Sequence, residues 1–290
     1  MIYNSLMLSK KINGMVQLFR PELSLAAGIC VTAGQVLASG RLPPLRIGFL
    51  GFLCAFALSG AALILNDYFD YEVDRINAPQ RPLPSGAVSR AEAIGLTVVT
   101  TLAGLSAAAL LGADVLVFSI LLWLIGALYN ARYKQAGLLG NLMVCASVAA
   151  TFILGAFSMG APWSKVVWTF SLMAFFLDLG EEIAGDAMDM EGDKKRASRS
   201  IALIKGKRFA LRITIALWTL VILLSLLPAI MGWLGTVYLI FILVTDALLV
   251  FFSIRLLMSQ TPESGRQAMR GAYLGATLGV VAFLIGQLLS

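Results

Sequence analysis

The sequence contains no histidine among its 290 residues. This absence excludes histidine metal ligands, a histidine general base, and catalytic relays that pass a proton from serine or cysteine to histidine. Cysteine is scarce as well, because Cys30, Cys54 and Cys145 are the only three, and all of them lie inside apolar runs without the spacing of metal ligands. Disulfide bonds and structural zinc are therefore not expected.

Charged residues are the second deficit. They make up 13% of the chain, whereas hydrophobic residues make up 59% and the mean hydropathy is +0.86. Soluble domains are usually about 25% charged and about 45–50% apolar. This composition excludes an ordinary soluble domain and indicates a chain that crosses a membrane several times. The net charge of +6 is not read as a sign of nucleic-acid binding, because the basic residues follow the membrane topology.

Long apolar runs are abundant. A membrane-crossing helix needs about 20 mostly apolar residues, and nine stretches qualify. We therefore expect an all-α, polytopic bundle of nine transmembrane helices. The expected spans are 22–39, 46–66, 91–111, 114–131, 140–160, 165–185, 209–230, 235–256 and 271–289. In the last span Gly271, Gly275 and Gly279 recur every four residues, which predicts a stripe for close helix packing.

The Lys and Arg residues fall mainly on one side of these spans. With the N-terminus inside, all of the 22 except Arg41, Arg46 and Lys165 lie on the inner side. By the positive-inside rule we expect a multi-pass cell-membrane protein whose N-terminus is cytoplasmic. The first residues, MIYNSLMLSKKINGMVQLFR, indicate a short amphipathic helix on the membrane surface.

Three aspartates lie together at the inner end of the second expected span. Asp67, Asp70 and Asp74 occur in NDYFDYEVDRIN, and at about 100° per residue they share one helical face. Like charges this close repel one another unless a cation lies between them. Mg²⁺ binds carboxylate oxygens and keeps positions for water or substrate phosphates. The motif therefore predicts a Mg²⁺ site for a phosphate-bearing substrate.

The same spacing occurs a second time, at Asp186, Asp189 and Asp193, each 119 positions after its counterpart. This offset also superposes the first four spans on the next four. An even number of helices separates the copies, so the repeats have the same orientation. We expect a single domain, 1–290, with two parallel four-helix repeats at about 22–135 and 141–254, followed by a ninth helix. Both acidic motifs then fall on the cytoplasmic face, which becomes the expected active-site face.

Several polar residues near the motifs are candidates for substrate binding. Pro79, Pro82 and Pro84 cannot continue a helix, so Arg81 is expected in a constrained loop beside the first motif, where it suits bidentate binding of phosphate. The further candidates are Arg75, Arg132, Lys134 and Glu182. For the basic ones, a purely topological role is the alternative. Asp246, in the eighth span, is interpreted as a hydrogen-bonded packing residue.

These parts suit the heterolysis of an allylic diphosphate. Mg²⁺ held by the aspartates would stabilise the departing diphosphate, and an apolar cavity would hold an isoprenoid chain and exclude water. No protein nucleophile is needed, in agreement with the missing histidine. A cation transporter is the alternative outside the enzymes, although transport sites usually lie near the membrane midplane. An alcohol phosphotransferase that uses Mg²⁺ is disfavoured. Its motif has Gly and Ala-Arg between the acidic pairs, and residues 71–75 of this sequence do not show that pattern.

The two motifs resemble those of the UbiA superfamily of intramembrane prenyltransferases. NDYFDYEVD matches its N-D-x-x-D-x-x-x-D motif and DAMDMEGD its D-x-x-D-x-x-G-D motif. The resemblance spans nearly the whole chain and implies a Mg²⁺-dependent prenyltransferase with nine helices. It also implies a polyprenyl diphosphate donor, a lipid or aromatic acceptor, contact with membrane lipids and no nucleic-acid partner. Catalytic and metal-binding roles are implied for Asp67, Asp70, Asp74, Asp186, Asp189 and Asp193, and substrate binding for Asn66, Arg81, Arg132 and Lys134.

Within the superfamily, three stretches are most similar to the branch that forms the second ether bond of archaeal lipids. They are INAPQRPLPSGAVSRAEA, LYNARYKQAGLLGN and EIAGDAMDMEGD, and they imply geranylgeranyl transfer to geranylgeranylglyceryl phosphate. Glu181 and Gly185 stand where that branch usually has Arg and Lys, and Ser200-Ile201-Ala202 replaces its T-L-P. An aromatic or pigment acceptor, of the 4-hydroxybenzoate, quinone-precursor or chlorophyllide type, is therefore the alternative.

Overall fold

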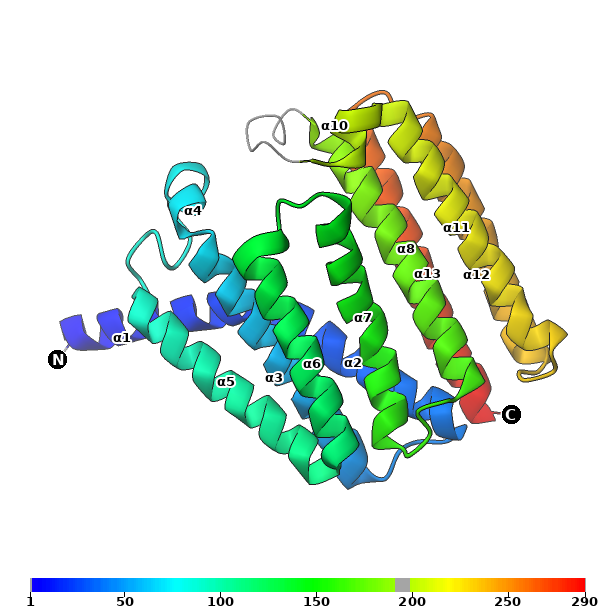
Figure 1. Ribbon diagram of the computed structural model, residues 1–290, viewed down its shortest axis with the longest axis horizontal. Coiled ribbons are helices and arrows are strands. Elements are labelled where there is room, and N and C mark those ends of the chain that lie inside the picture. Colours follow the sequence, from blue (N-terminus) through cyan, green and yellow to red (C-terminus); the bar gives the residue numbers. More distant parts are fainter. Residues whose placement is uncertain (1, 191–198, 290) are drawn as a thin grey trace. The chain divides into compact units, whose positions relative to one another are not determined.

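The computed structural model describes residues 2–190 and 199–289, and every regular element among these residues is a helix (Figure 1). The expected all-α class is thus confirmed for the described part of the chain. Asp193, the last residue of the second acidic motif, lies outside the described residues. The side chains of residues 2–8 and of parts of 282–289 also lie outside them.

The first eight expected spans coincide with long helices to within a few residues, whereas the helix at the ninth, expected at 271–289, begins nine residues earlier, at Pro262. In chain order the elements are α1 (Ile2–Phe19), α2 (Pro21–Ser39), α3 (Leu45–Phe69), α4 (Tyr71–Asn77), α5 (Arg90–Leu111), α6 (Ala113–Leu128), the π-helical turn η1 (Tyr129–Tyr133), α7 (Leu138–Ser158), α8 (Lys165–Met188), α10 (Ile201–Lys205), α11 (Lys207–Ile230), α12 (Thr236–Leu257) and α13 (Pro262–Leu289).

By length and composition, 7 of the helices in the described residues can cross a membrane: α2, α3, α5, α6 with η1, α7, α11 and α12. The other two expected spans overlap α8 and α13. α8 carries Asp178, Glu181 and Glu182 in its interior, and the end of α13 is only partly described. The total of nine spans and the two four-helix repeats therefore stay predictions.

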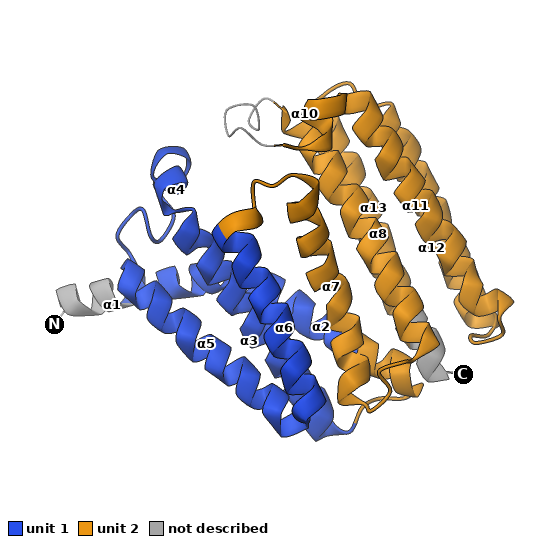
Figure 2. Ribbon diagram, viewed as in Figure 1, with its two compact units in different colours: residues 1–32, 44–131 blue, residues 33–43, 132–290 orange. Residues whose placement is uncertain are grey.

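The chain divides into two compact units, 1–32 with 44–131 and 33–43 with 132–290 (Figure 2). In the first unit, α3 packs along α5, while α1 and α6 contact α3. Its core cluster lies where α1, α3 and the start of α5 meet, and it consists of Leu18, Ile64, Leu83, Val88 and Ala93, with Tyr68 and Tyr71 packed against it. This core therefore lies directly beneath the segment that carries the first acidic motif.

The second unit is built from α7, α8, α11, α12 and α13, which contact one another in pairs along their lengths. Its core surrounds Trp218, which is 1% exposed and donates a hydrogen bond from Nε1 to the Leu177 carbonyl oxygen at 3.1 Å. The last turns of α2 belong to this unit, where Gln35 donates to the Ser158 hydroxyl oxygen at 2.9 Å.

Asp246 is buried between α11 and α12. The Ser225 hydroxyl donates to the Asp246 carboxylate at 2.7 Å, and the Tyr238 hydroxyl donates to the Ser225 carbonyl oxygen at 2.5 Å. A buried polar group is tolerated when it is hydrogen-bonded in this way. The interpretation of Asp246 as a hydrogen-bonded packing residue is confirmed.

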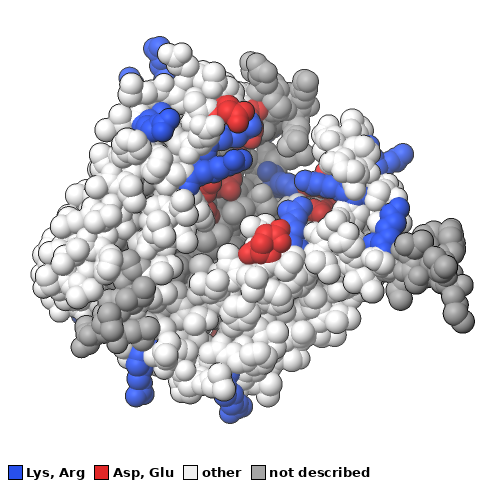
Figure 3. Space-filling view, turned by 180° about the vertical axis from the view of Figure 1, so that it is seen from behind, with Lys and Arg blue, Asp and Glu red and all other residues white. Residues whose placement is uncertain are grey.

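The surface is largely uncharged. Most of the face in Figure 3 is formed by residues other than Lys, Arg, Asp and Glu. Many large apolar side chains on the membrane-type helices are exposed, among them Val99 (64%), Leu102 (59%) and Leu223 (62%). Apolar groups exposed to this extent suit contact with lipid, because water would disfavour them.

The glycine stripe of α13 packs on α12. A Cβ atom added at Gly271 would collide with the ring of Phe252, and one added at Gly279 would come within 2.5 Å of the Thr245 hydroxyl oxygen. The stripe therefore allows the two helix backbones to approach closely, as the sequence predicted.

Gly271→Leu is therefore expected to destabilise the protein by about 1–3 kcal/mol, because overpacked cores must shift to accept added atoms. Thermal unfolding in detergent would measure the loss. Gly95→Leu is the matched control, since Gly95 also lies inside a helix but has no atom within 4 Å of an added Cβ. Equal unfolding temperatures for the two variants would contradict the packing role.

Candidate active site

The first acidic motif lies where α3 passes into α4. Asp70 is both the C-cap residue of α3 and the N-cap residue of α4, with φ −80° and ψ 0°. Its N–H donates to the Asn66 carbonyl oxygen at 3.0 Å, and its own carbonyl accepts from the Asp74 N–H at 2.8 Å. The backbone thus stays close to helical through the joint. Asp67 and Asp74 are buried, at 3% and 6% exposure.

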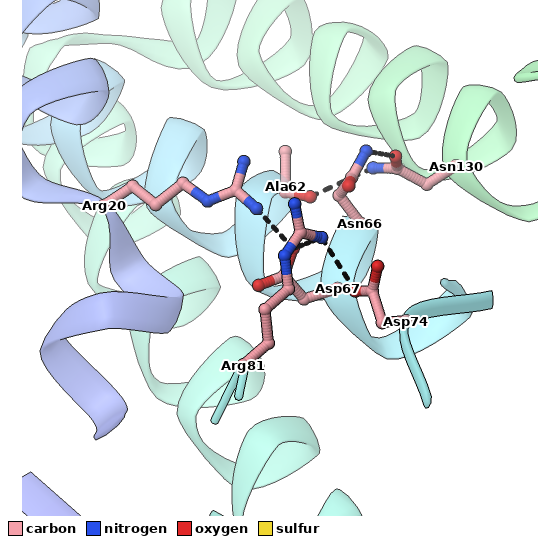
Figure 4. A network of polar contacts seen from close by, with 7 residues as sticks. All are labelled: Arg20, Ala62, Asn66, Asp67, Asp74, Arg81 and Asn130. Carbon is pink, nitrogen blue, oxygen red and sulfur yellow. Dashed lines mark hydrogen bonds and ion pairs between the residues drawn. The ribbon is translucent and has the colours of Figure 1, made fainter. Parts of the chain in front are cut away.

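Arg81 lies beside these carboxylates. After α4 the chain folds into consecutive turns, which Leu83 and Val88 anchor in the core. The Arg81 guanidinium is 2.7 Å from the Asp74 carboxylate and 3.8 Å from that of Asp67 (Figure 4). The structure therefore brings Arg81 to the acidic motif, as the proline-rich loop predicted.

The charge balance around Arg81 keeps it protonated. Burial by itself lowers the pKa of Arg81, but the hydrogen bond to Asp74 and the negative charges of Asp74, Asp67 and Asp70 outweigh it and raise that pKa above its usual value. The Arg81 side chain remains 40% exposed. One side of the guanidinium is thus committed to the carboxylates, while the rest of the group is open to a further anion.

Arg20 is a second cation on the motif, and sequence reasoning missed it. It joins α1 to α2 with a positive φ of 48°, and its guanidinium lies 2.5 Å from the Asp67 carboxylate (Figure 4). A non-glycine residue in this backbone region is uncommon and marks a sharp turn. The only signal in the sequence is its place at the end of the amphipathic segment, directly before Pro21.

Asn66 is held by the π-helical turn η1, which follows α6. Its side-chain amide donates to the Asn130 side-chain oxygen at 3.0 Å, and Asn130 in turn donates to the Ala62 carbonyl oxygen at 3.0 Å (Figure 4). Asn130 belongs to the π-helical turn η1, and such turns are frequent at functional sites. Asn130 lies two positions before Arg132, within the basic cluster that the sequence singled out.

Arg75, in α4, lies at the surface. It pairs with Glu72 at 3.2 Å, and both side chains are largely exposed, at 59% and 75%. Its guanidinium also lies 5.9 Å from the Tyr71 ring centre. Of the two arginines considered next to the first motif, the structure therefore brings Arg81 and not Arg75 to the carboxylates of Asp67 and Asp74.

In the second unit, the described part of the second motif lies at the end of α8. Asn141 donates to the Asp186 carboxylate at 3.0 Å, and Arg266 pairs with Asp189, the cap of α8. Glu182 lies half-buried one turn before Asp186. The sequence does not reveal Asn141 and Arg266 as partners of the motif, and for Arg266 it predicts only a place on the inner side of the membrane.

Arg132 and Lys134 lie at and just after η1. Arg132 is exposed, with its guanidinium 5.9 Å from the Tyr133 ring centre, and Lys134 is half-buried. The basic cluster expected there is thus positioned by the π-helical turn.

The donor set of the first motif fits Mg²⁺ in chemical type, since it offers carboxylate oxygens. Asp67 and Asp74 share the guanidinium of Arg81, so the two carboxylates face a common centre. Among the described residues, however, no group of three or more acidic or cysteine side chains is arranged to hold a metal by itself. Further oxygen ligands for an ion at this centre would come from a bound substrate or from water.

Fold and site together define a class: a multi-pass helical membrane protein with acidic motifs at its helix ends that are neutralised by arginine. Residues 27–285 match the UbiA prenyltransferase family, and the chain belongs to that family. The chain is therefore a prenyltransferase.

Several relatives extend over nearly the full length. A digeranylgeranylglyceryl phosphate synthase of Thermococcus kodakarensis is 31% identical over 278 residues, covering 96% of this chain and 99% of that protein. A solved structure of digeranylgeranylglyceryl phosphate synthase matches with a TM-score of 0.84 and 27% identity, over 97% of this chain and 99% of that one. A UbiA homolog from Archaeoglobus fulgidus, solved with GPP and Mg²⁺, has the same fold, with a TM-score of 0.65 and 19% identity over 93% of this chain and 99% of that one.

Proposed function

We propose that this protein transfers a geranylgeranyl group from its diphosphate to geranylgeranylglyceryl phosphate, forming an ether bond in membrane-lipid biosynthesis. The observation that carries the proposal is the network in which Arg20 and Arg81 neutralise Asp67 of α3 and Asp74 of α4 (Figure 4). Cations and carboxylates gathered in this way suit a ligand that brings both metal ions and phosphate oxygens. The names of the near full-length relatives support the choice of donor and acceptor.

The acidic residues of the two motifs, Asp67, Asp70, Asp74, Asp186, Asp189 and Asp193, are proposed as Mg²⁺ ligands. Bound Mg²⁺ would supply Lewis-acid stabilisation of the departing diphosphate. Asn66, Arg81, Arg132 and Lys134 are proposed to bind the substrates' phosphate groups, with Glu182 and Arg75 as further substrate-binding candidates. Arg81 is suited to this role because its guanidinium is partly exposed beside the motif.

The proposed reaction breaks the bond between the allylic carbon and its diphosphate oxygen, and the diphosphate leaves with the electron pair. The acceptor hydroxyl oxygen forms the new ether bond to that carbon, and its proton passes to the diphosphate that has left. Arg81, whose guanidinium is partly exposed beside the carboxylates, and Arg20 stabilise the leaving group as negative charge develops on the phosphate oxygens. Apolar helices around the site hold the prenyl chains and keep water from the cationic intermediate.

We propose that the active-site face is cytoplasmic and that residues 1–290 act as one UbiA-like domain with repeats at about 22–135 and 141–254. The excess of Lys and Arg in the loops next to the acidic motifs supports this orientation. The matched spacing of the two motifs supports the duplication.

An aromatic or pigment acceptor is the second candidate. It is favoured by one observation, that Glu181 and Gly185 replace two cations usual in the ether-lipid branch. Glu181 is half-buried in α8, and an added Cβ at Gly185 would have Met269 as its nearest neighbour at 3.7 Å. The missing lysine is therefore not explained by a lack of space at the Cβ position.

A transfer assay with the purified protein in lipid nanodiscs tests the proposal. Radiolabelled geranylgeranyl diphosphate and Mg²⁺ are supplied with geranylgeranylglyceryl phosphate or with a panel of aromatic acceptors. We expect labelled ether lipid from the glyceryl phosphate, and its loss when EDTA removes the metal. Transfer only to an aromatic acceptor would establish the second candidate instead. No transfer to any of these acceptors would overturn the proposal.

A further inference from the structure

Arg90 contacts the first acidic motif from outside, and the function proposed above assigns it no role. Its guanidinium carbon lies 4.5 Å from the ring centre of Tyr68 and 5.2 Å from that of Tyr71. Both distances are within the range of a cation–π interaction. Tyr68 belongs to α3 and Tyr71 to α4, so one cation contacts an aromatic ring on each side of the joint at Asp70.

The position of Arg90 is set independently of the motif. It is the first residue of α5, which begins with a capping box: the Ser89 hydroxyl accepts from the Glu92 N–H at 3.2 Å, and the Ser89 N–H donates to the Glu92 carboxylate at 2.9 Å. Lys11 of α1 also pairs with Glu92 at 2.5 Å. The start of α5 therefore holds Arg90 against the joint.

The joint needs such support. α4 is only 7 residues long, and a helix this short is not stable by itself in water. Asp67 lies on one side of the joint and Asp74 on the other, and their like charges repel each other. A change in the angle between α3 and α4 would move one carboxylate relative to the other. Mg²⁺ tolerates little deviation from its ligand geometry, so such a change would weaken its binding.

We propose that Arg90 is a positioning residue, which braces Tyr68 and Tyr71 across the α3–α4 joint and thereby holds the carboxylates of the first motif at the spacing that binds metal and diphosphate. The proposal rests on the Mg²⁺–diphosphate role proposed for this motif. This role differs from direct binding of phosphate by Arg90. A brace depends on the rings of Tyr68 and Tyr71, whereas direct binding of phosphate would not.

Metal affinity provides a readout separate from turnover. Mn²⁺ binding to the protein in nanodiscs, with inorganic diphosphate present, is followed by electron paramagnetic resonance. Each cation–π contact at an exposed site contributes on the order of a two- to fivefold effect. Arg90→Gln removes both contacts and should weaken Mn²⁺ binding about tenfold. Tyr71→Leu removes one ring and should weaken it about threefold, whereas Tyr71→Phe keeps the ring and should bind as the wild type does.

Two controls separate the brace from a general loss of structure. Arg46→Gln removes an arginine of the same unit that contacts the Leu110 carbonyl oxygen at the far end of α5, and it should leave Mn²⁺ binding unchanged. Combining Arg90→Gln with Tyr71→Leu should weaken binding no more than Arg90→Gln does, because residues that act through one contact are not additive.

The outcomes distinguish the brace from the function on which it rests. Wild-type affinity in Arg90→Gln, or equal weakening by Tyr71→Phe and Tyr71→Leu, would overturn the brace while the proposed function stands. The brace would also be overturned if Arg90→Gln weakened Mn²⁺ binding while Tyr71→Leu and Tyr68→Leu both left it unchanged. Absence of diphosphate-dependent Mn²⁺ binding in the wild type would overturn both.

Discussion

Replacing Asp70 by asparagine is expected to reduce prenyl transfer at least about a thousandfold while the protein remains inserted and folded. Asp70 lies between Asp67 and Asp74 on the same face, so the substitution removes one of the three carboxylates proposed to hold the metal and the diphosphate. The side chain of asparagine has nearly the same shape but no negative charge. Its amide binds Mg²⁺ far more weakly than a carboxylate does.

The fold should survive this change because Asp70 supports the α3–α4 joint through its backbone. Its N–H donates to Asn66 and its carbonyl accepts from Asp74, and asparagine retains both bonds. Removing a negative charge also lowers the repulsion within the motif. Initial rates in nanodiscs measure the effect on transfer, and thermal unfolding measures the effect on stability.

Glu72→Gln is the matched control for Asp70→Asn. Glu72 lies two positions away in the same segment, but its carboxylate is 75% exposed and points to Arg75 on the surface. The Glu72→Gln variant should transfer prenyl groups at close to the wild-type rate. An Asp70→Asn protein with more than a tenth of wild-type activity would contradict the metal role of the first motif.

The helices themselves could be predicted from the sequence. Long apolar runs such as Ile47–Leu65 have few alternatives to a helix in a membrane, because every backbone polar group must be satisfied within the segment. The acidic motifs could be recognised for a related reason, since three aspartates recurring on one helical face at the end of such a run are too costly to be there by chance. The prediction that the three aspartates share one face does not fail at the break between α3 and α4, because the backbone at Asp70 stays nearly helical.

The partners of the carboxylates could not be predicted. Arg20 lies 47 positions from Asp67, Asn130 lies 64 positions from Asn66, and Arg266 lies 77 positions from Asp189. Such contacts depend on how helices pack side by side, and nothing local in the sequence specifies them.

The choice between Arg75 and Arg81 illustrates the same limit over a short distance. Both follow the first motif within a few residues and both looked like phosphate ligands. The direction of α4 and the turns after it decide that Arg81 returns to the carboxylates while Arg75 pairs with Glu72 on the surface. The local sequence pattern identifies two candidate arginines. The tertiary structure decides that Arg81 is the one that contacts the carboxylates.

Arg81→Ala is expected to lower kcat/KM for the prenyl diphosphate by about a hundredfold, with a rise in KM that accounts for much of the change. The guanidinium of Arg81 contacts Asp74 at 2.7 Å and Asp67 at 3.8 Å, yet the side chain is 40% exposed. Arg81 is therefore placed both to neutralise the carboxylates of the motif and to bind the diphosphate that arrives with the metal. Removing Arg81 abolishes its contact with the diphosphate and leaves the buried carboxylates of Asp67 and Asp74 facing each other, with Arg20 paired to Asp67.

Arg81→Lys separates charge from geometry. Lysine restores one positive charge, but its ammonium is a point charge on a flexible stem and does not present the planar fork that binds two oxygens at once. It should therefore recover only part of the loss, about tenfold, with KM still raised. Steady-state kinetics in nanodiscs with varied diphosphate would measure both parameters, with Arg46→Ala as the control arginine. An unchanged KM in Arg81→Ala would contradict binding of the donor by this guanidinium in the ground-state complex, because the loss of a contact made equally in the ground state and the transition state raises KM.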